Sequence, residues 1–280
     1  RLHEAATGTE DTKQEVLTKD FNMWQTGRIM HWIKGDRIRP LQIDRRITDC
    51  RYQDGWQVFV GLDFSQGDDL FAVTYLAVDY TPSDTMRGRF FADTDCWVLE
   101  ETMRQSPNRP LYEQWAAAGW LHICPGEVFD SMLAINRIAE VAQSGVNIVS
   151  FGYDPAQSIQ PINQLKAWLQ TLFQRTDVSP KELADVIQRM VIPVSQTSMT
   201  QNPRVGELEH MSLEKEPWLT FSMNPMWPWM FGNCACELNS SDLRRIVKGG
   251  PQATHKIDGV AALIDALYGF DLSEGRIESN

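Results

Sequence analysis

The stretch Trp56-Gln57-Val58-Phe59-Val60-Gly61-Leu62-Asp63 decides the fold that this sequence predicts. It is rich in β-branched and aromatic residues, which favour a β-strand, and it ends at a carboxylate. A polar turn over 64–69 follows, and two further strands are predicted over 70–78 and 89–99. Three such strands in succession predict an antiparallel meander.

Beyond residue 100, predicted helices and strands alternate. Helical periodicity is clearest over 131–143, where Asp130 is in position to cap the helix. Further helices are predicted over 111–118, 159–173, 181–190, 206–213 and from about 258, and strands over 146–154, 191–194 and 219–223. This order predicts an α/β fold with a mixed sheet, antiparallel in its first three strands and covered by helices on both faces.

The sequence divides into three parts. Residues 1–50 are predicted to be an arm or linker with a short helical piece over 17–33, residues 51–272 the folded domain, and 273–280 a flexible tail. The chain has 280 residues, of which 42% are hydrophobic, enough for a substantial core. The first residue is Arg1 and not methionine, so we expect a fragment of a longer protein.

No apolar run approaches the about 20 residues that span a bilayer, and no signal peptide is visible, so no membrane association is predicted. The five cysteines are odd in number and scattered, which favours a reducing cytoplasm over a disulfide framework. Cys234 and Cys236 have no second pair at zinc-finger spacing, which argues against a zinc site.

The net charge of −11 argues against a nucleic-acid partner, unless carboxylates bind cations and basic residues gather locally. Basic residues gather in two stretches, over 37–46 and over 244–248. Each stretch is equally compatible with a solvated surface.

Three carboxylates lie at the ends of predicted elements. Asp63 ends the first strand, Asp154 ends a later strand, and Asp258 begins the last helix. If the two strands are neighbours, their carboxylates project from the same edge of the sheet, where ligands bind in open α/β folds. Each aspartate alone is also compatible with an ordinary turn or helix cap.

Clustered carboxylates repel one another and take up protons unless a cation neutralises them. Mg²⁺ and Mn²⁺ prefer oxygen ligands, and a pair of such ions can activate water and stabilise the leaving oxygen of a phosphodiester. The three aspartates are therefore candidate catalytic and metal-binding residues for a two-metal phosphodiester hydrolase.

Three segments resemble the nuclease motifs of the large terminase subunit of tailed bacteriophages. The first is Gly61-Leu62-Asp63-Phe64-Ser65 with the following 68–73, the second is Phe151-Gly152-Tyr153-Asp154-Pro155, and the third spans 256–263. Segments 21–24, 194–196 and 233–248 also resemble connecting regions of that family. The resemblance covers about residues 17 to 270.

The resemblance implies an RNase H-like nuclease that cuts concatemeric viral DNA during genome packaging. It also implies that Asp63, Asp154 and Asp258 bind two Mg²⁺ or Mn²⁺ ions. It also implies an additional acid shortly after the first motif, for which Asp69 fits better than Asp68. This acid would orient a metal-binding residue or a water molecule. Asp265 shares a helix face with Asp258, from which it could approach the site, but an exposed helix position is the stronger expectation. Candidate DNA-binding residues are Lys248, Lys256, Arg244 and Arg245.

The implied partners are double-stranded DNA, an upstream ATPase motor domain, the portal and the small terminase subunit. The resemblance places the protein in the host cytoplasm, at the portal of the procapsid, and not in the finished virion. No G-x-x-x-x-G-K-[ST] motif is present in this chain, so it is not itself the motor.

Three alternatives remain at the level of sequence. Another RNase H-like enzyme, such as a transposase or resolvase, would share the acids, although transposases usually add a strongly basic domain. A sugar-kinase-like or actin-like ATPase would need a second glycine-rich loop, which 151–155 does not provide. A non-catalytic packaging module on the same fold would not bind divalent metal.

Overall fold

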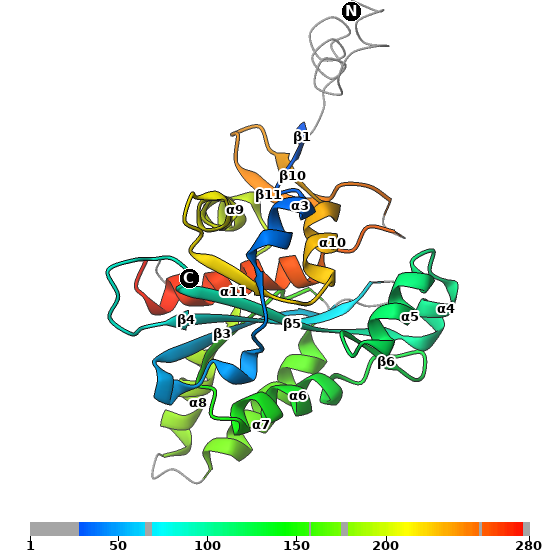
Figure 1. Ribbon diagram of the computed structural model, residues 1–280. Helices are drawn as coiled ribbons and strands as arrows, with labels where there is room; N and C mark the ends of the chain where they lie inside the picture. The colour runs from blue at the N-terminus through cyan, green and yellow to red at the C-terminus, as the bar shows by residue number, and fades with distance from the viewer. Residues whose placement is uncertain (1–27, 65–68, 157, 175–178, 252–253, 277–280) are drawn as a thin grey trace, which may run out of the picture.

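A computed structural model describes residues 28–64, 69–156, 158–174, 179–251 and 254–276 (Figure 1). Its strands form one large sheet in the order β2-β9-β5-β4-β3-β7-β8, with β6 beside β5, and one small sheet in the order β1-β10-β11. The strands are β1 (Arg28–His31), β2 (Gln42–Ile43), β3 (Trp56–Phe64), β4 (Phe71–Asp79), β5 (Phe90–Leu99), β6 (Leu121–Cys124), β7 (Ile148–Tyr153), β8 (Val191–Pro193), β9 (Leu219–Ser222), β10 (Cys234–Leu238) and β11 (Arg244–Lys248). The helices are α3 (Gly35–Ile38), α4 (Glu100–Gln105), α5 (Arg109–Ala117), α6 (Ser131–Gln143), α7 (Ile159–Phe173), α8 (Pro180–Met190), α9 (Ser198–Leu213), α10 (Met226–Asn233) and α11 (Asp258–Ser273), with short 3-10 turns η1 (Arg39–Leu41), η2 (Ile47–Asp49) and η3 (Tyr52–Asp54).

The predicted antiparallel meander is confirmed. Strand β4 runs antiparallel to both β3 and β5, while β7 lies parallel to β3 and β8 parallel to β7. The large sheet is therefore mixed, as predicted. Asp130 caps α6 by accepting a hydrogen bond from the backbone N–H of Met132.

Helices cover both faces of the large sheet, which confirms the predicted fold class. Helix α11 lies across one face, below α9, α10 and the small sheet, and α6 and α7 cover the other face (Figure 1). The buried residues form two clusters, one on each side of the sheet. Among the residues described, no helix is both long and apolar enough to cross a bilayer.

Two adjacent glycines bring α11 onto the sheet. Gly61 of β3 and Gly152 of β7 are register partners, and both face α11. A Cβ atom at Gly61 would lie 1.7 Å from the carbonyl oxygen of Ala262, and one at Gly152 would lie 2.2 Å from that of Asp265. Neither position can hold a side chain, so the helix backbone rests directly on these strands.

The structure differs from the sequence prediction where pairing is long-range. Residues 28–31 form strand β1, paired with β10, and not part of the helix predicted over 17–33; the remainder of that prediction over 17–27 lies outside the described residues. Strand β1 depends on a partner about 200 residues away, which no local pattern shows.

Two helices differ from their predicted bounds. Helix α9 begins at Ser198 and is therefore longer than the helix predicted over 206–213, and it accommodates Pro203 in its interior. Helix α11 reaches Ser273, and residues 277–280 of the predicted tail lie outside the described residues.

Asp93 of β5 provides a prediction on stability and pH. It is buried and accepts a hydrogen bond from the backbone N–H of Ile47 at 3.0 Å, which ties η2 to the sheet. Burial, and then the charge of Asp95, raise the pKa of Asp93 from 3.8 to about 6. The folded protein holds this proton more tightly than the unfolded chain, so the stabilisation is complete below pH 4 and is lost as pH rises through about 6.

We therefore expect the free energy of unfolding of the wild type to fall, relative to that of Asp93→Asn, as the pH rises from about 4 through about 6. The difference should reach about 3 kcal/mol, from a pKa difference of about two units. Urea unfolding of both proteins at pH 4, 5, 6 and 7 measures it. Parallel pH profiles for the two proteins would contradict the prediction.

Candidate active site

Three elements bring the predicted acids to one region of the molecule. Asp63 is the next-to-last residue of β3, and Asp154 directly follows β7, the parallel neighbour of β3. Asp258 is the first residue of α11, which the close contacts at Gly61 and Gly152 hold against the same two strands. Burial raises the pKa of Asp63 well above its ordinary value, and the charges of Asp258, Asp265, Asp154 and Asp69 raise it further. The charges of the surrounding carboxylates therefore act on the buried Asp63.

Asp258 is the most unusual of these groups. Its side chain is 3% exposed, and within the described part of the chain its Oδ2 atom has no hydrogen-bond partner. Burial, followed by the charge of Asp69, raises its pKa to about 7. A buried carboxylate oxygen without a partner is destabilising, and a bound cation would remove this penalty.

Asp69 is held by two lysines. Its Oδ1 atom accepts hydrogen bonds from Lys248 Nζ at 2.5 Å and from Lys256 Nζ at 2.8 Å. Burial alone would raise the pKa of Asp69, but the bonds and charges of the two lysines outweigh it and lower the pKa. Lys256 is buried, and Lys248 keeps partial exposure. The other possible acid of this segment, Asp68, lies outside the described residues.

The two candidate DNA-binding arginines lie on β11 and form ion pairs. Arg244 contacts Glu209 at 2.7 Å, and Arg245 contacts Glu237 at 2.5 Å. Both arginine side chains remain partly exposed, at 31% and 44%. Their charges are thus partly balanced by local acids.

The expectation that Asp265 is exposed is wrong. The residue is 2% exposed, and Gln196 Nε2 donates a hydrogen bond to its Oδ1 at 3.0 Å. The physical reason is that the helix face shared with Asp258 is the face pressed against β3 and β7. The seven-residue spacing in the sequence was the available signal, and it indicated the correct face.

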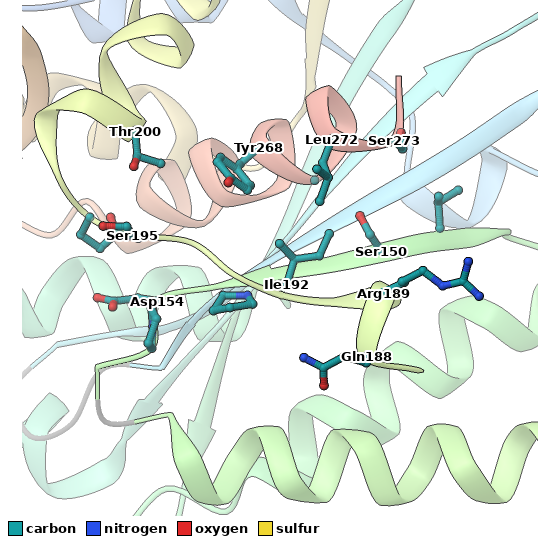
Figure 2. A pocket seen from close by; sticks show the side chains of 15 residues that line it. Ser150, Asp154, Gln188, Arg189, Ile192, Ser195, Thr200, Tyr268, Leu272 and Ser273 are labelled. Carbon is teal, nitrogen blue, oxygen red and sulfur yellow. The ribbon is translucent and has the colours of Figure 1, made fainter. Parts of the chain in front are cut away.

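A groove of about 980 Å³ leads away from Asp154 along β7 and β8 (Figure 2). Ser150 and Ile192 form part of its floor, Tyr268 and Leu272 of α11 form one wall, and Arg189 lies at the far end. The hydroxyl of Ser150 is buried and has no hydrogen-bond partner among the described residues. The groove makes the Asp154 end of the acid cluster accessible to a ligand.

The donor chemistry fits a divalent cation. Asp63, Asp154 and Asp258 offer only carboxylate oxygens, which Mg²⁺ and Mn²⁺ prefer, and one oxygen of Asp258 is buried without a partner. In the described ranges, no three acidic, histidine or cysteine side chains already stand at the spacing of a formed metal site. The fit therefore rests on the donor set and its electrostatics.

Comparisons with known proteins bear on the family and the fold of this chain. The family described as "Terminase large subunit, endonuclease domain" matches residues 2–274. The structure of the HK97 bacteriophage large terminase is similar, with a TM-score of 0.66 and 19% identity over 94% of this chain and 50% of that chain. The large terminase nuclease from thermophilic phage G20c has a TM-score of 0.46 and 13% identity, over 83% of this chain and 94% of that chain.

The chain spans half the length of the HK97 protein. No curated protein matches it. Because the family match extends over nearly the entire sequence, this chain belongs to the family of terminase large subunit endonuclease domains.

Proposed function

We propose that this chain is a divalent-metal-dependent endodeoxyribonuclease that cuts concatemeric viral DNA during genome packaging. The observation that carries the proposal is the acid cluster at the meeting point of β3, β7 and α11, in a chain of the terminase endonuclease family. Asp63, Asp154 and Asp258 would be the catalytic and metal-binding residues.

Two Mg²⁺ or Mn²⁺ ions held by these aspartates would polarise the phosphodiester and lower the pKa of the attacking water. The protein's own contribution is positioning. The glycine contacts of α11 fix Asp258 relative to Asp63, and Asp69 would act as an outer partner that orients the site.

Basic side chains would hold the DNA backbone. Arg244, Arg245 and Lys248 keep exposed surface and are suited to phosphate contacts. Lys256 is 1% exposed, so its charge would act on DNA through the local potential and through Asp69.

The proposed assembly is that of a packaging motor. Double-stranded DNA would be the substrate, delivered by an ATPase domain upstream in the full-length chain, with the portal and the small terminase subunit as further partners. The place of action would be the host cytoplasm, at the portal of the procapsid. Within the chain, 1–50 would connect to the motor, 51–272 would be the nuclease, and 273–280 a tail.

The test is cleavage of supercoiled plasmid with Mn²⁺, with Mg²⁺ and with EDTA. We expect nicking or linearisation by the wild type with metal and none with EDTA. Asp63→Ala should abolish cleavage, whereas Asp84→Ala, which changes an exposed loop acid, should leave it unchanged.

If no cleavage is seen, the binding of Mn²⁺ to the same proteins, measured by calorimetry, shows the reason. A wild type that neither cuts nor binds metal would overturn the proposal and favour a non-catalytic packaging module. Metal binding without cutting would show that the isolated chain needs the motor to present DNA.

A further inference from the structure

Asp265 is a buried carboxylate to which the mechanism above gives no role. It lies seven residues after Asp258 on α11, and its side chain is 2% exposed. Its backbone carbonyl rests against Gly152, two residues before Asp154. The residue therefore lies beside the strand that delivers Asp154.

Backbone geometry places Asp265 beside the acid cluster, because Gly152, against which it rests, pairs with Gly61, and Asp154 and Asp63 each follow two residues later. Burial raises the pKa of Asp265 well above its ordinary value, the Gln196 hydrogen bond opposes the rise, and the charge of Asp154 adds to it. Conversely, Asp265 raises the pKa of Asp63 more than Asp154 does. Asp265 thus interacts with both strand-end acids.

A chain of side-chain amides orients Asp265. Gln196 Nε2 donates to Asp265 Oδ1 at 3.0 Å, and Gln196 Oε1 accepts from Gln201 Nε2 at 2.6 Å. Gln201 Oε1 accepts from the backbone N–H of Ile246 on β11 at 2.9 Å. The amide oxygens of Gln196 and Gln201 each accept a hydrogen bond from another group, so Gln196 presents its N–H group to the carboxylate of Asp265. Outer partners of this kind orient metal-binding carboxylates.

A second buried acid on α11 shows what is different about Asp265. Asp271 is also buried, but Arg204 contacts it at 2.7 Å and balances its charge. Among the described residues, no lysine or arginine forms an ion pair with Asp265, which receives only the neutral Gln196 amide. Buried charges in proteins are paired or bind metal.

An independent observation points to a cation in the same cluster. Asp258 Oδ2 is buried and has no partner in the part of the chain that the structure describes. We propose that Asp265 is a fourth carboxylate of the metal-binding cluster, oriented by Gln196 and Gln201. This inference rests on the proposed metal-dependent function.

The test measures Mn²⁺ binding by calorimetry and the thermal midpoint in EDTA and in Mn²⁺. Asp265→Asn should weaken Mn²⁺ binding at least about 10-fold, the lower limit for loss of even an outer partner. In EDTA the variant should be at least as stable as the wild type, because a neutral amide removes repulsion from Asp63 and Asp154. A purely structural role would give the opposite pattern, a less stable variant with unchanged Mn²⁺ affinity, and would overturn the inference.

Asp271→Asn is the matched control, because it removes a buried acid of the same helix outside the cluster. It should lower the midpoint in EDTA by weakening the Arg204 pair, and it should leave Mn²⁺ affinity unchanged. If Asp265→Asn does not fold, Gln196→Leu gives the answer: weaker Mn²⁺ binding supports the inference and unchanged binding overturns it.

Asp63→Ala separates the two proposals. A wild type that binds no Mn²⁺ overturns both the proposed function and this inference. Mn²⁺ binding that Asp63→Ala loses and Asp265→Asn retains overturns the inference alone.

Discussion

Replacing Gly61 by alanine is expected to lower the free energy of unfolding by about 3 kcal/mol or more, at or beyond the upper end of ordinary overpacking in cores. The added Cβ would lie 1.7 Å from the carbonyl oxygen of Ala262 and 2.8 Å from the backbone nitrogen of Ala266. Both atoms belong to the backbone of α11, which cannot rotate away as a side chain could. The helix must therefore move off β3, and the packing of its buried face is lost.

Urea unfolding measures this effect, and Gly232→Ala is the control. A Cβ atom at Gly232, in α10, would lie 4.0 Å from the backbone nitrogen of Gly35, an ordinary contact distance. We therefore expect the free energy of unfolding to change by less than about 1 kcal/mol, with any gain coming from helix propensity. Gly152→Ala should act in the same direction as Gly61→Ala, since its Cβ would lie 2.2 Å from a helix carbonyl. A Gly61→Ala protein as stable as wild type would show that α11 does not rest on β3.

Asp258→Asn is expected to have two opposite effects. Cleavage of DNA with Mn²⁺ should fall by more than about 100-fold, because loss of an outer partner alone costs 10–100-fold and Asp258 is a proposed direct ligand. In EDTA the same substitution should raise the thermal midpoint, because it removes the charge of a buried group that repels Asp63 and Asp69. The two measurements together separate loss of function from loss of folding.

Asp242→Asn provides the comparison for both measurements, because Asp242 is an exposed acid in the turn between β10 and β11. It should change neither cleavage nor the midpoint. An Asp258→Asn protein that cuts DNA at the wild-type rate would remove Asp258 from the site, and one that is less stable in EDTA would contradict the proposed repulsion.

Much of the fold and the positions of the three acids could be predicted, because both depend on local signals. The strand at 56–63 is rich in β-formers, and helices 131–143 and 159–173 have the predicted bounds. The acids were predicted at the ends of elements, and the parallel pairing of β3 with β7 brings Asp63 and Asp154 to the same edge.

The surroundings of the acids could not be predicted, because they depend on contacts between distant segments. The bond between Lys256 and Asp69 joins residues 187 positions apart, and the bond between Gln196 and Asp265 joins residues 69 apart. Lysine is usually exposed, so the sequence offered a phosphate contact or a solvated position for Lys256 and gave no sign of a buried ion pair. The small sheet was missed for the same reason, since β1 pairs with a strand near the other end of the chain.

The short outer strands of the large sheet affect how copies of this protein behave when crowded together. Strand β2 has two residues and β8 has three, and Pro193 at the end of β8 has no backbone N–H to offer. A long exposed edge strand invites another sheet to pair with it, which leads to aggregation, whereas short edges and proline discourage this. These two edges offer few free backbone groups, so neighbouring copies at high local concentration would remain separate unless other surfaces join them.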